Sequence, residues 1–332
     1  MKLYKYILSA LAVGALTVAC DEDVERIPGE ELVRAYTYGP QYYQDLRDYK
    51  DSDHSIAFGW VADYAKDNSM ENSFLGLPDS LDICSLWGGI PTNEKVFNDM
   101  RFVQKTKGTK MFVVAITRIN AETQEKYHKQ VYDSARAAGD REMVDSAMRL
   151  YAEYFVDQVF LNDLDGFDAD NEPEGDYNAG NVFINFMKHI AKWLGPNPDI
   201  TREQRYQYIL DRYGKEIADR PGACDKQLAV DGGGPSELAP YCNWFFQQAY
   251  GGGTSLSGGW PAEKQVFCCN MGDNWQGDLT AMYNQASWQP ASGRKGGFGA
   301  FILQRNYRIT ETNIEPYYHF RRCIQIQNPA IY

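Results

Sequence analysis

The sequence has little positive charge and few histidines. Its 332 residues include 33 Lys and Arg against 45 Asp and Glu, which gives a formal net charge of −12. Nucleic-acid binding normally depends on a basic stripe, and no Lys/Arg-rich run offers one, so we expect no nucleic-acid partner. The four histidines lie far apart and none is paired with cysteine at a zinc-binding spacing, so we expect no metal site. These histidines are His54, His128, His189 and His319.

The chain also lacks a phosphate-binding loop and any apolar run long enough to span a bilayer. Gly-rich stretches at 232–234 and 251–253 are followed by neither Gly-Lys-Ser/Thr nor GxGxxG, so we expect no nucleotide cofactor. No cysteines show Cys-x-x-Cys spacing. After export the six cysteines beyond residue 20 allow disulfides, but buried thiols are favoured for Cys268 and Cys269, whose side chains alternate on a strand-like run.

The N-terminus has the pattern of an export signal. Lys2 and Lys5 precede an apolar segment, 7–18, that is too short to cross a membrane. Leu16 to Cys20 resembles a bacterial lipobox, and the acidic run after Cys20 resembles the export tag of Bacteroidetes surface lipoproteins. We therefore expect a signal peptide at 1–19, lipidation of Cys20 and an acidic tether over 20–53. Such a protein would be an outer-membrane lipoprotein exposed at the cell surface, held to the membrane through its lipid anchor only.

The rest of the chain, 54–332, alternates strand-like and helical segments. Hydrophobic residues make up 44% of the chain, enough for a large core. Helical patterns are expected at 122–160, 181–194 and 201–219. Eight strands interleaved with helices in one domain predict an α/β fold, a (β/α)8 TIM barrel, with a doubly wound sheet as the alternative. The expected strands are 55–61, 80–86, 110–117, 164–170, 227–230, 241–248, 265–270 and 297–303.

The fourth strand carries an unusual line of acids. Because side chains alternate along a strand, Asp168, Asp170 and Glu172 share one face. Like charges this close disfavour ionisation, and in a buried core they would need partners. At the mouth of a barrel, the same repulsion holds a proton near neutral pH, as a general acid requires.

The run from Asp165 to Glu172 resembles the Asp-Gly-x-Asp-x-Asp-x-Glu signature of glycoside hydrolase family 18, the chitinases and endo-β-N-acetylglucosaminidases. The resemblance extends along the chain. Residues 244–251 are similar to the sixth strand of the endoglycosidase branch, with its Gln-x-Tyr pair at Gln248 and Tyr250. Residues 295–301 resemble the last strand, and 321–329 resemble the closing helix of Bacteroidetes members.

The resemblance implies a substrate-assisted retaining mechanism without metal or cofactor. Glu172 would protonate the glycosidic oxygen and later activate water. Asp170 and Tyr250 would orient the substrate's 2-acetamido group, which acts as the nucleophile. Asp168 would share charge and a proton with Asp170. The further candidates for substrate binding or for supporting the geometry are Gln248, Asp165, Trp60, Trp87 and Asn270.

Two departures from the chitinase pattern bear on the substrate. Chitinases usually have an aromatic residue before the catalytic Glu and a Trp ending the eighth strand, where this chain has Asn171 and either Phe301 or Leu303. We therefore favour an endo-β-N-acetylglucosaminidase that cleaves between the core GlcNAc residues of N-glycans. A non-catalytic surface glycan-binding protein is the alternative, and a chitinase is less favoured. Other surface glycan-uptake proteins are candidate partners.

Overall fold

The computed structural model describes residues 38–67, 69–118, 125–172, 181–275 and 279–329. The chain divides into two compact units, Met1–Gln44 and Asp45–Tyr332. In the first unit the rings of Tyr38 and Tyr42 lie 4.2 Å apart. The expected signal peptide, Cys20 and most of the acidic tether lie outside the described residues. Helix α3, Pro40–Asp51, forms within the stretch expected to be tether, and the boundary of the barrel domain near residue 53 stays a prediction.

Eight parallel strands in the described part of the second unit close into a barrel, in which each strand pairs with its neighbours in sequence and β8 pairs with β1. This confirms the (β/α)8 barrel and excludes the doubly wound sheet. The strands are β1 Ile56–Val61, β2 Ile83–Leu86, β3 Lys110–Ile116, β4 Gly166–Asn171, β5 Gln227–Gly232, β6 Trp244–Gln247, β7 Gln265–Asn270 and β8 Gly297–Phe301.

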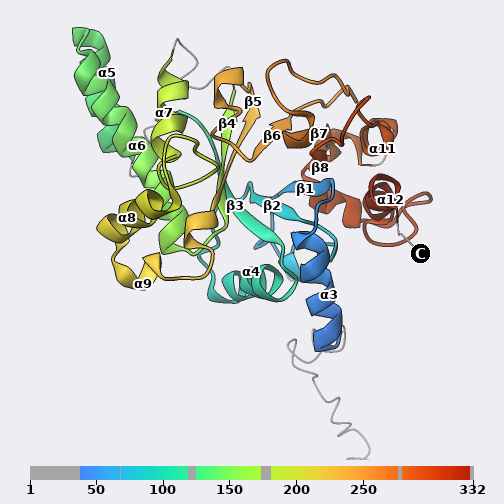
Figure 1. Cartoon of the computed structure of the whole chain (residues 1–332). Coiled ribbons are helices and arrows are strands. Elements are labelled where there is room, and N and C mark those ends of the chain that lie inside the picture. The colour runs from blue at the N-terminus through green and yellow to red at the C-terminus, as the bar shows by residue number, and fades with distance from the viewer. Residues whose placement is uncertain (1–37, 68, 119–124, 173–180, 276–278, 330–332) are drawn as a thin grey trace, which may run out of the picture. The chain divides into compact units, whose positions relative to one another are not determined.

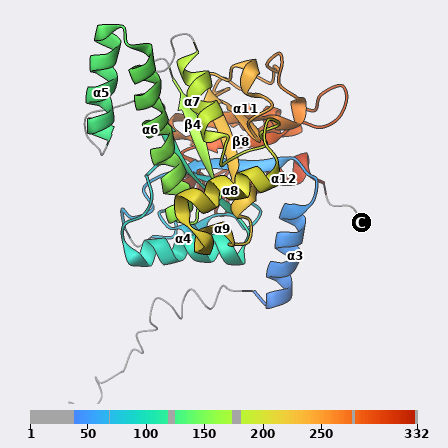
Figure 2. The same ribbon diagram turned by 60° about the vertical axis from the view of Figure 1, so that its left-hand side comes forward.

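Helices surround the barrel (Figure 1). Helices α4, α6 and α11 pack on the strands, and α12 packs on α11. Helix α7 packs on α6, and Figure 2 shows the two side by side. The helices of the second unit are α4 Glu94–Thr106, α5 Glu125–Ala138, α6 Arg141–Leu161, α7 Val182–Ile190, α8 Arg202–Tyr213, α9 Lys215–Ala218, α10 Met271–Asn274, α11 Thr280–Ser287 and α12 Tyr318–Gln327. Within the described residues, none of the helices combines the length and apolar character needed to cross a membrane.

Two expected helices are each broken by a glycine. The segment 122–160 becomes α5 and α6 because Gly139 has a φ of +68°, and Asp140 then caps α6 by accepting from the Met143 N–H at 3.0 Å. The segment 201–219 becomes α8 and α9 because Gly214 has a φ of +79°. Left-handed backbone is favourable for glycine, so the periodic pattern on either side could not continue as one helix.

Alternating side chains divide the core into two layers. Phe58, Phe112 and Phe246 fill the barrel interior, and the rings of Phe58 and Phe246 stack 3.7 Å apart. The outward side chains of the strands pack beneath the helices. Cys268 belongs to the inner layer and Cys269 to the outer one, as their alternation predicts. The six cysteines of the described residues are all free thiols, so none of the disulfides that export would allow is formed among them.

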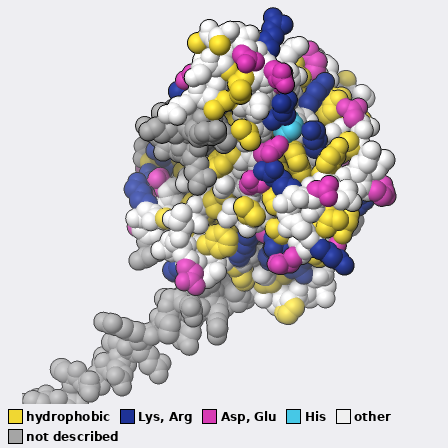
Figure 3. Space-filling view, turned by 90° about the vertical axis from the view of Figure 1, so that its left-hand side faces the viewer, with side chains coloured by type: hydrophobic (Ala, Val, Ile, Leu, Met, Phe, Trp, Pro, Cys, Tyr) yellow, Lys and Arg dark blue, Asp and Glu magenta, His cyan; other side chains and the backbone are white. Residues whose placement is uncertain are grey.

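One face of the molecule carries Lys and Arg side chains interspersed with Asp and Glu (Figure 3). Apolar side chains lie singly or in small groups among them. This mixture is typical of a solvated surface, and this face presents no basic stripe.

Candidate active site

Strand β4 carries its acids into the barrel. Phe167 and Ala169 face outward into the layer beneath the helices, so Asp168 and Asp170 face inward. Asp168 is completely buried and Asp170 is 1% exposed. Glu172 directly follows the strand and is half-buried. The line of acids therefore runs from the closed interior of the barrel to its mouth.

Asp168 is the acid of this line that lies farthest from the mouth of the barrel. Its Oδ2 accepts hydrogen bonds from Trp60 Nε1 at 3.0 Å and from Ser85 Oγ at 2.8 Å. Burial raises the pKa of the Asp168 carboxyl; the Ser85 hydrogen bond opposes the shift and the Asp170 charge adds to it. Asp168 therefore binds a proton more readily than an ordinary aspartate.

A fourth acid, Asp231, joins the line from β5. It pairs in register with Asp170 across the two strands and is completely buried. The expected fifth strand ended at Val230, so Asp231 was not among the predicted site residues. Its signal was nonetheless present, because Leu228 and Val230 face outward and the next residue of the strand must face inward.

Gln248 links two of these acids. It lies just beyond β6, and its Nε2 donates to Asp231 Oδ1 at 2.7 Å and to Asp170 Oδ1 at 3.3 Å. The amide therefore fixes the spacing of two carboxyls on neighbouring strands. Gln248 thus lies within the site that the sequence predicted for it.

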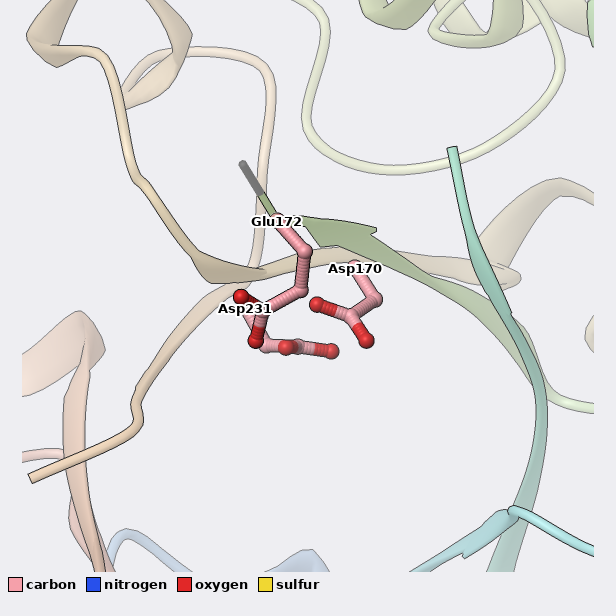
Figure 4. A group of neighbouring side chains, drawn as sticks. All are labelled: Asp170, Glu172 and Asp231. Atoms are coloured by element: carbon pink, nitrogen blue, oxygen red, sulfur yellow. The ribbon is translucent and has the colours of Figure 1, made fainter. Parts of the chain in front are cut away.

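Glu172 differs from the other acids because it lines an open cavity. The cavity has a volume of about 760 Å³. In Figure 4 the side chains of Glu172, Asp170 and Asp231 point toward one another. The acid nearest the mouth is therefore the one placed to meet a bound molecule. The other residues lining the cavity are Asn171, Gly232, Gly233, Phe245, Gln247, Gln248, Ala249 and Ser257.

Tyr250 lies near the same acids. It is half-buried after β6, with its ring centroid 6.0 Å from that of Phe301 at the end of β8. Burial raises the pKa of the Tyr250 hydroxyl, and the charges of Cys268, Asp231, Asp170 and Glu172 add to the shift. The hydroxyl therefore keeps its proton and can donate a hydrogen bond.

The two candidate tryptophans occupy different positions. Trp60 is 1% exposed, and its indole N–H is bonded to Asp168, so its ring has no face open to a sugar. The expectation that Trp60 binds substrate directly is therefore corrected: it supports Asp168. Trp87, just beyond β2, is 36% exposed, and its ring lies 5.3 Å from that of Phe301 in an edge-on arrangement. Trp87 keeps an accessible aromatic face.

Asp165 and Asn270 lie at opposite ends of the barrel. Asp165 precedes β4 and its Oδ2 accepts from Gln104 Nε2 at 2.7 Å and from the Met111 N–H at 2.8 Å. Asp170 is five residues further along the chain, roughly 16 Å away in extended backbone, so Asp165 braces the amino-terminal end of the barrel and is too far away to bind substrate. Asn270 ends β7, and its Oδ1 accepts from the Gly272 N–H at 2.7 Å. It stays at the same end of the barrel as Glu172.

One group in the described residues has the spacing of a cation site. Carboxylate oxygens of Asp170, Glu172 and Asp231 lie within 4.8 Å of one another, and oxygen ligands of this kind suit Mg²⁺ or Ca²⁺. The negative charges of these carboxylates repel one another, and protons shared among the carboxyls would relieve that repulsion as a bound cation would. Burial and the charges of Asp168 and Asp170 raise the pKa of Asp231 well above its ordinary value, which favours protons.

Comparison with known proteins agrees with this architecture. Residues 20–258 match the model of glycoside hydrolase family 18, BT1044-like. The chain is 23% identical to endo-beta-N-acetylglucosaminidase F2 of Elizabethkingia meningoseptica over 295 residues, which cover 80% of this chain and 78% of that protein.

Two solved structures share the fold. A BT1044 structure superposes with a TM-score of 0.61 at 20% identity, covering 87% of this chain and 93% of that one. A Cordyceps militaris endo-beta-N-acetylglucosaminidase variant, in complex with fucosyl-N-acetylglucosamine-Asn, has a TM-score of 0.58 at 19% identity and covers 88% and 97%. With the family match spanning more than half of its length, the chain belongs to glycoside hydrolase family 18, BT1044-like.

Proposed function

We propose that the protein is an endo-β-N-acetylglucosaminidase that hydrolyses the β-1,4 bond between the two core GlcNAc residues of N-glycans. The observation that carries this proposal is that two acids of the same strand face have different surroundings. Glu172 faces a cavity of about 760 Å³, whereas Asp170 lies buried beside it on the same face of β4. A proton donor at the cavity and a buried carboxylate behind it suit a reaction in which the substrate supplies its own nucleophile.

In the first step the carbonyl oxygen of the substrate's 2-acetamido group attacks the anomeric carbon. The glycosidic C–O bond breaks and its oxygen takes the proton of Glu172. The product on the enzyme is an oxazolinium ion, which carries positive charge. Asp170 would offset that charge, and the Tyr250 hydroxyl would hold the acetamido oxygen in place.

In the second step Glu172 acts as a base. It takes a proton from water, whose oxygen attacks the anomeric carbon and reopens the oxazolinium ring to the acetamido group. Each step inverts the anomeric centre, so the overall reaction retains its configuration. The chemistry requires an N-acetylated sugar and no resident cofactor.

Two departures from the chitinase pattern favour an N-glycan over chitin. In place of the aromatic residue that chitinases have before the acid stands Asn171, whose Nδ2 donates to the Gly233 carbonyl at 2.7 Å. Phe301 stands at the end of β8 in place of the usual Trp. The Cordyceps militaris relative was solved with fucosyl-N-acetylglucosamine-Asn, a fragment of an N-glycan attached to its asparagine. This relationship supports N-glycans as the substrate class.

We further propose that the enzyme works at the cell surface as an outer-membrane lipoprotein. The support is in the sequence: two lysines, a short apolar segment, and Cys20 followed by acidic residues. A lipid on Cys20 would hold the catalytic barrel at the membrane through a tether.

The proposed activity is tested by incubating the full chain with N-glycoproteins of high-mannose and complex type. The released glycans are then identified by mass spectrometry. We expect glycans that carry one GlcNAc at the reducing end, with the other GlcNAc left on the protein. Glu172→Gln is the matched negative control. Binding without release would indicate a surface glycan-binding protein, and cleavage of chito-oligosaccharides alone would indicate a chitinase.

A further inference from the structure

The buried acids are connected through Asp231. Carboxylate oxygens of Asp231 and Asp170 lie within 4.8 Å of each other, and the charges of Asp168 and Asp170 both act on Asp231. Asp168 Oδ1 and Asp231 Oδ2 are both buried, and neither oxygen has a hydrogen-bond partner among the described residues. Two carboxylates cannot hydrogen-bond to each other unless one of them carries a proton. A proton on one carboxyl would let it donate to its neighbour, which would relieve both the repulsion between the charges and the missing partners of these buried oxygens.

The surroundings of Asp231 determine where those protons reside. It faces Asp168, Asp170 and Glu172 from β4 and its end, Gln248 and Tyr250 from the segment after β6, and Cys268 from β7. Burial disfavours the charged form of Asp231, and the Asp168 and Asp170 charges disfavour it further. Gln248 donates a single hydrogen bond to it, which opposes this effect.

We propose that Asp231 is a positioning residue that stays protonated in the resting enzyme and hydrogen-bonds to Asp170, so that the negative charge of the cluster resides on Asp170. This inference rests on the proposed function, in which Asp170 offsets the positive oxazolinium ion. Asp231 touches no reacting atom. It acts through Asp170, by keeping that carboxyl ionised and correctly oriented.

Two substitutions distinguish this role from a merely structural one. Asp231→Asn keeps the shape and a hydrogen-bond donor, so the kcat should stay within about threefold of wild type, with the acid limb of its pH profile unmoved. Asp231→Leu removes the donor and should lower kcat roughly 10- to 100-fold, the range for a lost hydrogen bond to a charged group. It should also shift the acid limb to higher pH, because Asp170 then takes up a proton more readily.

The opposite outcomes overturn the proposal. If Asp231 were ionised, both substitutions would remove a negative charge beside Asp170 and move the acid limb to lower pH. An unmoved limb in both variants would show that Asp231 only fills space. Asp82→Asn is the matched control: Asp82 is a buried carboxylate before β2, bonded to the Ala57 N–H at 2.7 Å and to His54 at 3.0 Å. It should leave the limb where it is.

A second measurement does not depend on turnover. The infrared carbonyl stretch of protonated carboxyl groups should be present at neutral pH in wild type, diminished in Asp231→Asn, and unchanged in Asp82→Asn. A band that Asp231→Asn leaves intact would refute the protonated state. If the wild type releases no glycan, the proposed function fails, yet the infrared band still decides the state of Asp231.

Discussion

Asp170 and Asp231 lie directly opposite each other on β4 and β5, and one side chain, that of Gln248, donates hydrogen bonds to both. Parallel strands bring such partners into register regardless of their separation in the sequence. The pair therefore links the acidic motif on β4 to the segment after β6, where Tyr250 lies. Changes in either strand should affect the same chemistry.

Substituting Glu172→Gln should abolish turnover while folding and glycan binding stay near wild type, because the amide keeps the shape of the side chain and cannot donate the proton. General acid catalysis contributes roughly 10²- to 10⁴-fold, so kcat should fall at least that far. Glycan release measured by mass spectrometry and binding measured by calorimetry give the two readouts. Release at the wild-type rate would show that another group is the acid.

A thiazoline mimic of the oxazolinium ion should bind far more tightly than the matching sugar. Analogues of the reacting state gain at least about 10²-fold in a site built for that state. The preference should weaken in Asp170→Asn, whose neutral amide cannot offset the positive ring, and should weaken less in Gln248→Ala. Calorimetric titration with both ligands measures it. Equal affinity of the wild type for the two, without glycan release, would favour a binding protein.

Replacing Asp168 by Asn should change how stability depends on pH. The folded-state pKa of Asp168 is raised, so the folded protein holds this proton where the unfolded chain loses it. That contribution is fully present below about pH 4, the ordinary aspartate range, and is lost as pH rises toward the raised folded-state pKa. Wild type should therefore lose stability relative to Asp168→Asn over this interval. Urea unfolding of both proteins at several pH values checks the sign, and a constant difference would contradict it.

Replacing Cys20 by Ala should move the protein from the membrane fraction to the soluble fraction. Acyl chains on a lipidated cysteine add about 0.8 kcal/mol per buried CH₂, whereas an acidic N-terminus has no attraction to anionic lipid. Immunoblots of the two fractions measure the change. Substitution of another cysteine far from the N-terminus, Cys224→Ala, is the control. If the Cys20 variant stayed in the membrane fraction, the proposed lipidation of Cys20 would be wrong.

The sequence predicts best what periodicity alone determines. Alternation along β4 places Asp168 and Asp170 inside the barrel, and alternation along β7 separates Cys268 from Cys269. Where a strand ends is harder to predict, because that depends on pairing with its neighbour. The expected fifth strand ended two residues short, at Val230, and Asp231 was missed for that reason.

Contacts between distant strands were also beyond prediction. Trp60 lies near a predicted strand end, a position that allows either stacking on sugar or packing in the core. Its indole N–H meets Asp168, which is 108 residues away, and no local pattern reports that distance. Asp165 belongs to the same motif as Glu172, yet strand geometry places the two at opposite ends of the barrel.

The closed strand order has a consequence for how the chain gains activity. Asp168 depends on Trp60 from β1 and Ser85 from β2, while Asp170 depends on Gln248 beyond β6. Contacts across such separations form slowly, since a long loop must close before they are made. A refolding chain can therefore collapse, bury tryptophans and gain helix before it can turn over any substrate. Recovery of catalysis should lag behind recovery of helix, and the length of that lag would time the closing of the barrel.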